Sequence, residues 1–239
     1  MTIIDYFAKT AIINLAERAD RRAETREEFK RAGWPIENTK ADFFPAIRPM
    51  EAAGFPSVGV RGCFLSHMLA IKQAKKEHLA NILIMEDDIA FIADINSIAA
   101  EALQELEGKK WGFLYLGHEH HSDLPSETRL EKISEPLLLA HFYAVNSTIF
   151  DRFLTFLEEL LQRTPGDPAG GPMHYDGAIS TFRMQNPDIN TFIVLPSLGY
   201  QRSSRTDLHP LSLWDRWRVL KPLTAGLRKL KNRIKRSAG

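Results

Sequence analysis

Short apolar runs alternate with longer amphipathic segments along most of the chain. Short apolar runs predict buried strands, and apolar residues that recur every three or four positions predict helices packed against them. The predicted strands lie at residues 11–15, 43–47, 82–85, 111–117, 142–145 and 191–195. The predicted helices lie at residues 16–32, 63–77, 98–106, 149–162 and 178–184. This alternation predicts an α/β fold, with a mostly parallel sheet covered by helices on both faces.

Composition narrows the class of protein. The chain has 239 residues, of which 44% are hydrophobic, and this content is enough for the core of one large domain. Segments rich in glycine and proline predict loops at 54–62 and 164–172. No apolar stretch approaches the ~20 residues of a membrane-spanning helix. The first five residues lack the basic-then-apolar pattern of a signal peptide, and the single cysteine, Cys63, excludes an intrachain disulfide. We therefore expect a cytoplasmic protein.

Charge is distributed unevenly along the chain. From Arg216 onward there are nine basic residues and no acidic ones; because the whole chain carries +1, residues 1–215 carry a formal charge of −8. Tryptophans and spaced aliphatic residues among these basic residues are typical of a helix at a membrane surface. We therefore predict a globular domain over 1–212 and a basic helical tail over 213–239. This tail would contact an anionic membrane surface through Arg216–Arg236, which places the protein on the inner face of the cytoplasmic membrane.

Other uses of the tail stay open. A disordered basic tail is one alternative, and a nucleic-acid contact is another. The acidic body and the lack of a nucleic-acid recognition motif argue against the second, so we expect no nucleic-acid partner.

An acidic motif follows the predicted strand at 82–85. Glu86, Asp87 and Asp88 come directly after four apolar residues, and three carboxylates cannot be buried there without partners. In open α/β sheets, ligands bind beyond the carboxyl ends of the strands. Carboxylate oxygens suit Mg²⁺ or Mn²⁺, which commonly bridge proteins to phosphates. The motif predicts either a cation site or a solvated acidic turn.

Other chemistry has weaker signals. The sequence has no glycine-rich phosphate loop, zinc-type cysteine spacing or nucleophile elbow, which removes the commoner nucleotide hydrolases, zinc sites and serine hydrolases. His118, His120 and His121 offer a possible metal site, although a polar loop after the strand at 111–117 is the more ordinary explanation.

Several segments, in collinear order over roughly residues 10–208, together resemble glycosyltransferase family 25, the lipooligosaccharide and lipopolysaccharide glycosyltransferases. The segments are Ile13-Asn14-Leu15 with Arg18, Asp20 and Arg21; Gly62 to His67; Ile84 to Asp88; Leu114 to Gly117; Tyr143 to Val145; His174 to Asp176; and Pro196 to Gln201 with Ser203, Ser204 and Asp207. The chain departs from the family at Val60 and Arg61, where members often carry an acidic or amide residue.

This resemblance implies a GT-A-like, Rossmann-type fold and a metal-dependent inverting glycosyltransferase. The reaction would move a hexose, galactose first among the candidates, from a UDP-sugar donor to a hydroxyl of a lipopolysaccharide, lipooligosaccharide or other glycan or glycolipid acceptor. A Mn²⁺ or Mg²⁺ ion would neutralise the leaving phosphate, and a base would deprotonate the acceptor hydroxyl. The alternative is a non-catalytic nucleotide-sugar-binding or scaffold protein in glycan assembly.

The resemblance also implies roles for individual residues. Asp88 and then Glu86 are the expected metal ligands, because alternate residues of an extended chain point to one side while Asp87 turns away. Asp176 is the expected catalytic base. The expected donor-binding residues are Asn14, Arg18, Arg21, Ser66, His67 and Asp87. The ordinary alternatives are helix capping for the aspartates, a packed helix for Ser66 and His67, and a solvated helix face for the arginines.

Overall fold

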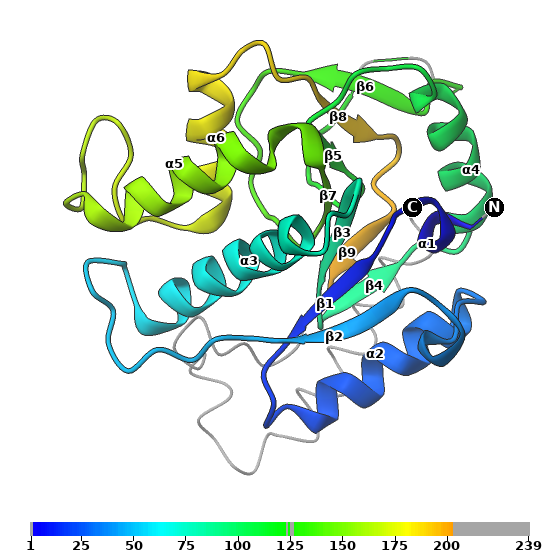
Figure 1. Cartoon of the computed structure of the whole chain (residues 1–239). Helices are drawn as coiled ribbons and strands as arrows, with labels where there is room; N and C mark the ends of the chain where they lie inside the picture. The colour runs from blue at the N-terminus through cyan, green and yellow to red at the C-terminus, as the bar shows by residue number, and fades with distance from the viewer. Residues whose placement is uncertain (1, 123, 125–126, 203–239) are drawn as a thin grey trace.

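A seven-stranded sheet forms the centre of the protein (Figure 1). The computed structural model describes residues 2–122, 124 and 127–202. The predicted basic tail at 213–239, with Arg216–Arg236, lies outside the described residues, as do Ser203, Ser204 and Asp207.

The strands of this sheet follow the order β2-β1-β3-β7-β5-β8-β6. Their bounds are β1 (Thr10–Asn14), β2 (Ala41–Pro45), β3 (Asn81–Glu86), β5 (Phe113–Tyr115), β6 (Leu130–Ile133), β7 (Phe142–Asn146) and β8 (Thr191–Val194). Five strands run in one direction, and only β6 and β7 run in the other. The prediction of an α/β fold with a mostly parallel sheet is confirmed. All six predicted strands exist, whereas β6 was not predicted.

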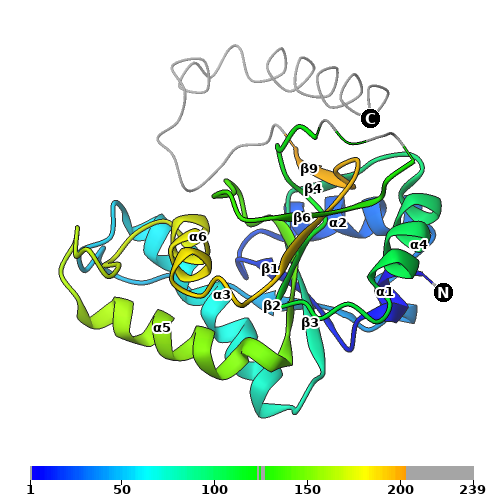
Figure 2. The ribbon, with the colours of Figure 1, turned by 90° about the horizontal axis from the view of Figure 1, so that it is seen from above.

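Helices cover both faces of the sheet (Figure 2). One face carries α3 (Val58–Lys76), α5 (Phe150–Gln162) and α6 (Tyr175–Gln185), and the other carries α1 (Ile3–Tyr6), α2 (Ala19–Arg31) and α4 (Ile95–Leu106). Each face of the sheet is covered by a hydrophobic core, and strand β3 contributes to both. Ile82 and Ile84 pack into the core on the α3 side, whereas Leu83 and Met85 pack into the core on the α2 side. None of the described helices is long and apolar enough to cross a membrane.

Helix α3 begins five residues earlier than the sequence predicts. Ser57 caps it by accepting a hydrogen bond from the backbone N–H of Val60. The prediction of a loop over 54–62 is therefore wrong for residues 58–62. These residues, including the glycines at 59 and 62, lie inside the helix. Ser66 and His67 consequently lie in the middle of the helix and not near its start.

A second, two-stranded sheet adjoins the acidic motif. Strand β4 (Ile89–Phe91) follows Asp88 directly and pairs antiparallel with β9 (Gly199–Gln201). Two short 3-10 helices, η1 (Ile36–Asn38) and η2 (Ser147–Ile149), complete the described elements. The pairing of β4 with β9 brings the chain near residue 200 back to the acidic motif, which the sequence did not predict.

Candidate active site

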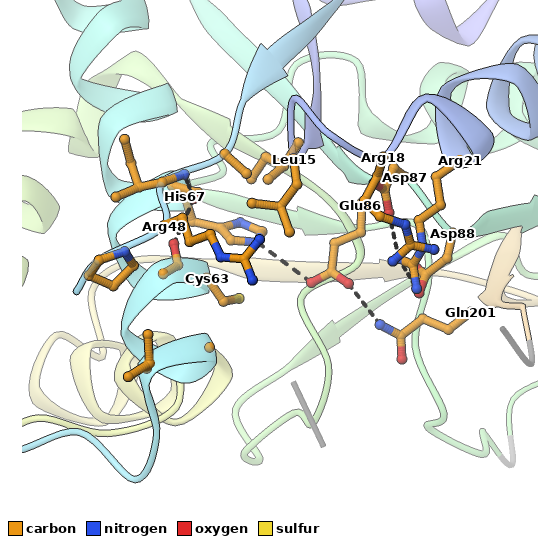
Figure 3. Close-up of a pocket in the computed structure, with 18 of the residues that line it drawn as sticks. Leu15, Arg18, Arg21, Arg48, Cys63, His67, Glu86, Asp87, Asp88 and Gln201 are labelled. Carbon is orange, nitrogen blue, oxygen red and sulfur yellow. Dashed lines mark hydrogen bonds and ion pairs between the residues drawn. The ribbon is translucent and has the colours of Figure 1, made fainter. Parts of the chain in front are cut away.

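A pocket of about 500 Å³ lies where β1, β2 and β3 end (Figure 3). These strands are parallel neighbours, so the residues that follow each of them meet at one edge of the sheet. Helix α3 and the end of β9 supply the other walls. Seven of the nine predicted site residues line the pocket: Arg18, Arg21, Ser66, His67, Glu86, Asp87 and Asp88. An eighth, the buried Asn14, does not line it but donates a hydrogen bond to Asp87.

Asp87 is held from two sides. Its Oδ1 accepts a hydrogen bond of 2.6 Å from Arg21 Nη1, and its Oδ2 accepts one of 2.7 Å from Asn14 Nδ2. Asn14 is held in turn by Arg22, whose Nη1 donates to its Oδ1 at 2.7 Å. The expectation that Asp87 turns away is wrong, since Asp87 lines the pocket with Glu86 and Asp88. Its two oxygens already bind groups of the chain, an arrangement that anchors the acidic turn.

Asp88 offers an oxygen that the described residues leave unused. Its Oδ2 lies 3.2 Å from Arg21 Nη1, whereas its buried Oδ1 has no hydrogen-bond partner among the described residues. Burial, followed by the negative charge of Glu86, raises the pKa of Asp88 to about 7, although Arg21 opposes this shift. A buried carboxylate oxygen without a partner is the group that a cation would satisfy.

Glu86 points toward α3. Its Oε2 accepts a hydrogen bond of 2.8 Å from Gln201 Nε2, and its Oε1 lies 3.6 Å from His67 Nε2. Burial by itself would raise the pKa of Glu86, but the interactions with His67, His141 and Gln201 together leave the pKa below its ordinary value. Glu86 therefore stays ionised at neutral pH.

His67 is fully buried within a chain of aromatic residues. Its Nδ1 lies 3.0 Å from the Tyr143 hydroxyl, which donates a 2.9 Å hydrogen bond to the Tyr175 hydroxyl. The His67 ring also stacks on Tyr175, with the ring centroids 4.5 Å apart. The two tyrosines lie in sequence segments of the family resemblance, but no local pattern predicts their contact with His67, because they belong to β7 and α6.

Ser66 holds the loop after β2 against α3. Its hydroxyl donates to the Gly62 carbonyl at 2.6 Å and accepts from the Ile47 backbone N–H at 2.8 Å. Gly62 permits this approach, since a Cβ there would lie 2.6 Å from the Ile47 carbonyl oxygen. The one hydroxyl hydrogen of Ser66 is used inside the protein, which makes Ser66 a support of the pocket wall.

Replacing Ser66 by alanine is expected to destabilise the protein by ~1–3 kcal/mol, because the partly buried Ile47 N–H loses its acceptor. The loop that carries Arg48 should also move, so the KM for the expected UDP-sugar donor should rise more than kcat falls. Urea unfolding and steady-state kinetics measure the two effects. Ser97→Ala is the control: Ser97 is exposed on α4, and its loss should change the free energy of unfolding by less than ~0.5 kcal/mol. Equal stability of the two variants would contradict the role of Ser66.

Four arginines line the pocket. Arg18 pairs with the exposed Asp20 at 2.9 Å, and its hydrogen bond lowers the pKa of Asp20 to about 2. Two of the four, Arg48 and Arg202, were not predicted: Arg48 pairs with Glu17, and Arg202 donates to the Asp87 carbonyl at 2.8 Å. Arg48 lies in no predicted motif, whereas Arg202 lies between Gln201 and Ser203 of the terminal family segment but was not singled out. Together the arginines make the pocket suited to an anionic ligand.

Asp176 lies elsewhere. It is in the first turn of α6, whose N-cap is His174, and it is not among the residues that line the pocket. Its oxygens accept hydrogen bonds from the backbone N–H groups of Leu139, at 3.0 Å, and Gly177, at 2.8 Å. Leu139 has a φ of 70°, which is costly for a leucine. The described contacts of Asp176 thus stabilise a strained turn, and its role as the base stays a prediction.

His118 and His120 lie near each other, with their ring centroids 6.4 Å apart, but the three histidines do not converge on one point. The buried His118 ring lies 2.8 Å from the Val194 carbonyl oxygen through Nε2, and burial lowers its pKa. His120 lies 3.8 Å from Glu131, and His121 is exposed. Within the described ranges, these three histidines do not gather into a group of metal ligands.

Comparison with known proteins gives one family. Residues 7–152 match the sequence profile of glycosyltransferase family 25, described as an LPS biosynthesis protein. The human protein named inactive glycosyltransferase 25 family member 3 is 24% identical over 155 residues, which are 57% of this chain and 26% of that protein. The lacto-N-neotetraose biosynthesis glycosyltransferase LgtB of Neisseria meningitidis serogroup B is 34% identical over 92 residues, 33% of this chain and 32% of that protein. The chain spans about a quarter to a third of the length of these relatives.

Two solved structures are similar at lower levels. Protein A197 from STIV has a TM-score of 0.40 and 13% identity, covering 81% of this chain and 85% of its own. A glycosyltransferase involved in the glycosylation of the major capsid of PBCV-1 has a TM-score of 0.37 and 9% identity, covering 79% and 93%. At these TM-scores the two structures do not bear on function.

Proposed function

The chain belongs to glycosyltransferase family 25, and on that premise we propose that it transfers a hexose, galactose first, from a UDP-sugar to a hydroxyl of a lipopolysaccharide, lipooligosaccharide or other surface glycan. The observation that carries the proposal is one pocket with four arginines and a carboxylate oxygen without a hydrogen-bond partner in the described part of the chain. The arginines suit a diphosphate, and the carboxylate suits a divalent cation. The name of the relative LgtB supports a glycan acceptor.

Asp88 and Glu86 fit a Mn²⁺ or Mg²⁺ ion. Both offer the oxygen ligands that these ions prefer, and Asp88 has a buried Oδ1 without a hydrogen-bond partner among the described residues. When bound, such an ion would neutralise negative charge on the leaving diphosphate. A dication would also replace the proton that the raised pKa of Asp88 retains near neutral pH.

The arginines would divide the work of binding the donor. Arg21 is buried and fixed by Asp87 and Asp88, so its position is set before any donor arrives. Arg18 and Arg48 pair with acids that are themselves exposed, Asp20 and Glu17. Exposed ion pairs contribute little to stability, so these two guanidinium groups can exchange their partners for a diphosphate. In this proposal Asn14 and Asp87 serve donor binding by positioning Arg21.

The acceptor side of the reaction needs a base on the face opposite the leaving group. Asp176 stays the proposed base. Its neighbour Tyr175 contacts His67 through ring stacking, and His67 lines the pocket, so α6 approaches the pocket from the α3 side. An acceptor hydroxyl would have to reach the first turn of α6 for Asp176 to act.

The first test of the proposal is a UDP-release assay. We expect UDP release from one of UDP-galactose, UDP-glucose and their N-acetyl forms, in the presence of Mn²⁺ and a lipid-linked acceptor. EDTA should abolish the release, since the leaving diphosphate would lose its neutralising cation. Release at an equal rate in EDTA would contradict the metal assignment, and release from no nucleotide sugar would contradict the transferase itself.

The second candidate function is non-catalytic: binding of nucleotide sugars, or a scaffold role in glycan assembly. The name of the human relative, an inactive family member, favours it. Saturable binding of a UDP-sugar with neither transfer nor hydrolysis would support this alternative. The intact acidic motif, with its unused Asp88 oxygen, favours the enzyme.

The proposed location follows from the tail. The basic segment Arg216–Arg236 would hold the protein at an anionic membrane surface on the inner face of the cytoplasmic membrane. Such a position would bring the pocket to a lipid-anchored acceptor.

A further inference from the structure

We infer that Cys63, His67 and Glu86 form a binding site for a thiophilic divalent cation of the Zn²⁺ type, separate from the oxygen-ligand ion whose first proposed ligand is Asp88; Glu86 is the one residue named for both sites. One ligand atom from each residue lies within 4.8 Å of the other two. In the part of the chain that the structure describes, this is the only group of three such side chains with that geometry.

The fold places the three ligands for local reasons. Cys63 and His67 are four residues apart in α3, so their side chains lie on the same face of the helix, one turn apart. Two ligands at this spacing on a helix are a common arrangement in zinc sites. Glu86 ends β3 and meets this face of α3 from the sheet.

The hydrogen bonds of His67 leave Nε2 available as a ligand. The single hydroxyl hydrogen of Tyr143 is donated to Tyr175, so the Tyr143 oxygen accepts from His67 Nδ1–H. A histidine that donates through one nitrogen presents a lone pair at the other, as metal-bound histidines do. Nε2 is fully buried and has no hydrogen-bond partner among the described residues.

The separation of His67 Nε2 and Glu86 Oε1 fits a bridging cation. His67 Nε2 and Glu86 Oε1 are 3.6 Å apart, too far for a good hydrogen bond. Ligand atoms held at ~2.0–2.3 Å by a tetrahedral zinc ion lie roughly 3.3–3.8 Å apart. Two acceptors that face each other across this gap would be bridged favourably by a metal ion.

The chemistry of the ligands selects the ion. Sulfur and imidazole nitrogen suit Zn²⁺ or Co²⁺, whereas Mn²⁺ and Mg²⁺ prefer oxygen. Burial, and then the negative charges of Glu86, Asp176 and Asp88, raise the pKa of the Cys63 thiol well above its ordinary value. The neighbouring negative charges favour a dication, which would displace the thiol proton on binding. Three protein ligands leave a fourth position open to the pocket, as in zinc sites that bind water or substrate.

The experiment is a Co²⁺ titration of the full, metal-free chain, followed by absorption. A thiolate bound to cobalt gives a charge-transfer band in the near ultraviolet, and Cys63 is the only cysteine in the chain. We expect a band that saturates at one Co²⁺ per chain and is lost on adding an equivalent of Zn²⁺, but that persists in excess Mg²⁺. Absence of the band at saturating Co²⁺ would overturn the inference.

Variants separate the three-residue site from a lone thiol. Cys63→Ser should abolish the band, and Glu86→Gln and His67→Gln should each weaken Co²⁺ binding by at least about tenfold. His120→Gln, outside the pocket, is the control and should bind as the wild type does. Because His67 is buried, Glu86→Gln carries the test if His67→Gln fails to fold. Unchanged binding in Glu86→Gln would overturn the site. The readout needs no turnover, so its failure would leave the proposed function untouched.

Discussion

Replacing Arg21 by methionine is expected to lower the free energy of unfolding by about 3–5 kcal/mol, the range seen when one partner of a buried ion pair is removed. Arg21 Nη1 lies 2.6 Å from Asp87 Oδ1 and 3.2 Å from Asp88 Oδ2, and all three side chains are almost inaccessible to water. Methionine fills much of the same volume but leaves two buried carboxylates without their ion-pair partner. Urea unfolding at neutral pH measures the loss.

The matched control for this prediction is Arg26→Met on the same helix. Arg26 pairs with Glu37 at 3.3 Å, and both side chains are about half exposed or more. Exposed pairs contribute only ~0–1 kcal/mol, so this variant should remain close to the wild type. Two variants of equal stability would show that Arg21 does not compensate the acidic turn, and the explanation of the buried carboxylates would then be wrong.

Replacing Asp88 by asparagine is expected to reduce turnover by at least about 100-fold, equivalent to about 2.7 kcal/mol of transition-state stabilisation. The amide keeps the shape of the carboxylate, yet it cannot supply the charged Oδ1 that would hold the cation against the leaving diphosphate. Asp42→Asn, at an exposed position of β2, is the control and should retain wild-type turnover. The measurement is kcat and kcat/KM at saturating Mn²⁺. A decrease in kcat of less than tenfold would contradict the assignment of Asp88 as a metal ligand.

This loss of activity should not be a loss of stability. The folded-state pKa of Asp88 is raised from 3.8 to about 7, so the folded chain keeps this proton to higher pH than the unfolded chain does. The contribution of Asp88 to stability therefore falls as the pH rises from about 4 to about 7. Asparagine carries no such charge. In metal-free buffer at pH 8, Asp88→Asn should unfold at a temperature equal to or above that of the wild type. A lower Tm would contradict the burial of an unused carboxylate.

Local patterns were sufficient for most of the architecture. Apolar runs located six strands of the main sheet because a strand buried on both faces needs apolar residues at every position, as Ile82 to Met85 show. The acidic motif was placed correctly at the end of β3, since a run of charges must end a buried strand. The start of α3 was missed, because glycines at 59 and 62 indicate a loop locally, whereas the Ser57 cap and packing against Ile47 favour a helix.

The sequence by itself determined the α/β class and the family, and it named the candidate site residues. Only the tertiary structure decided which of them meet. Arg21 contacts Asp87 across 66 residues, and His67 contacts Tyr143 across 76, because the strand order brings those elements together. The same topology places Arg48 and Arg202 in the pocket and leaves Asp176 outside it. Neither these contacts nor the burial that shifts the pKa of Asp88 follows from residue spacing, since both depend on elements distant along the chain.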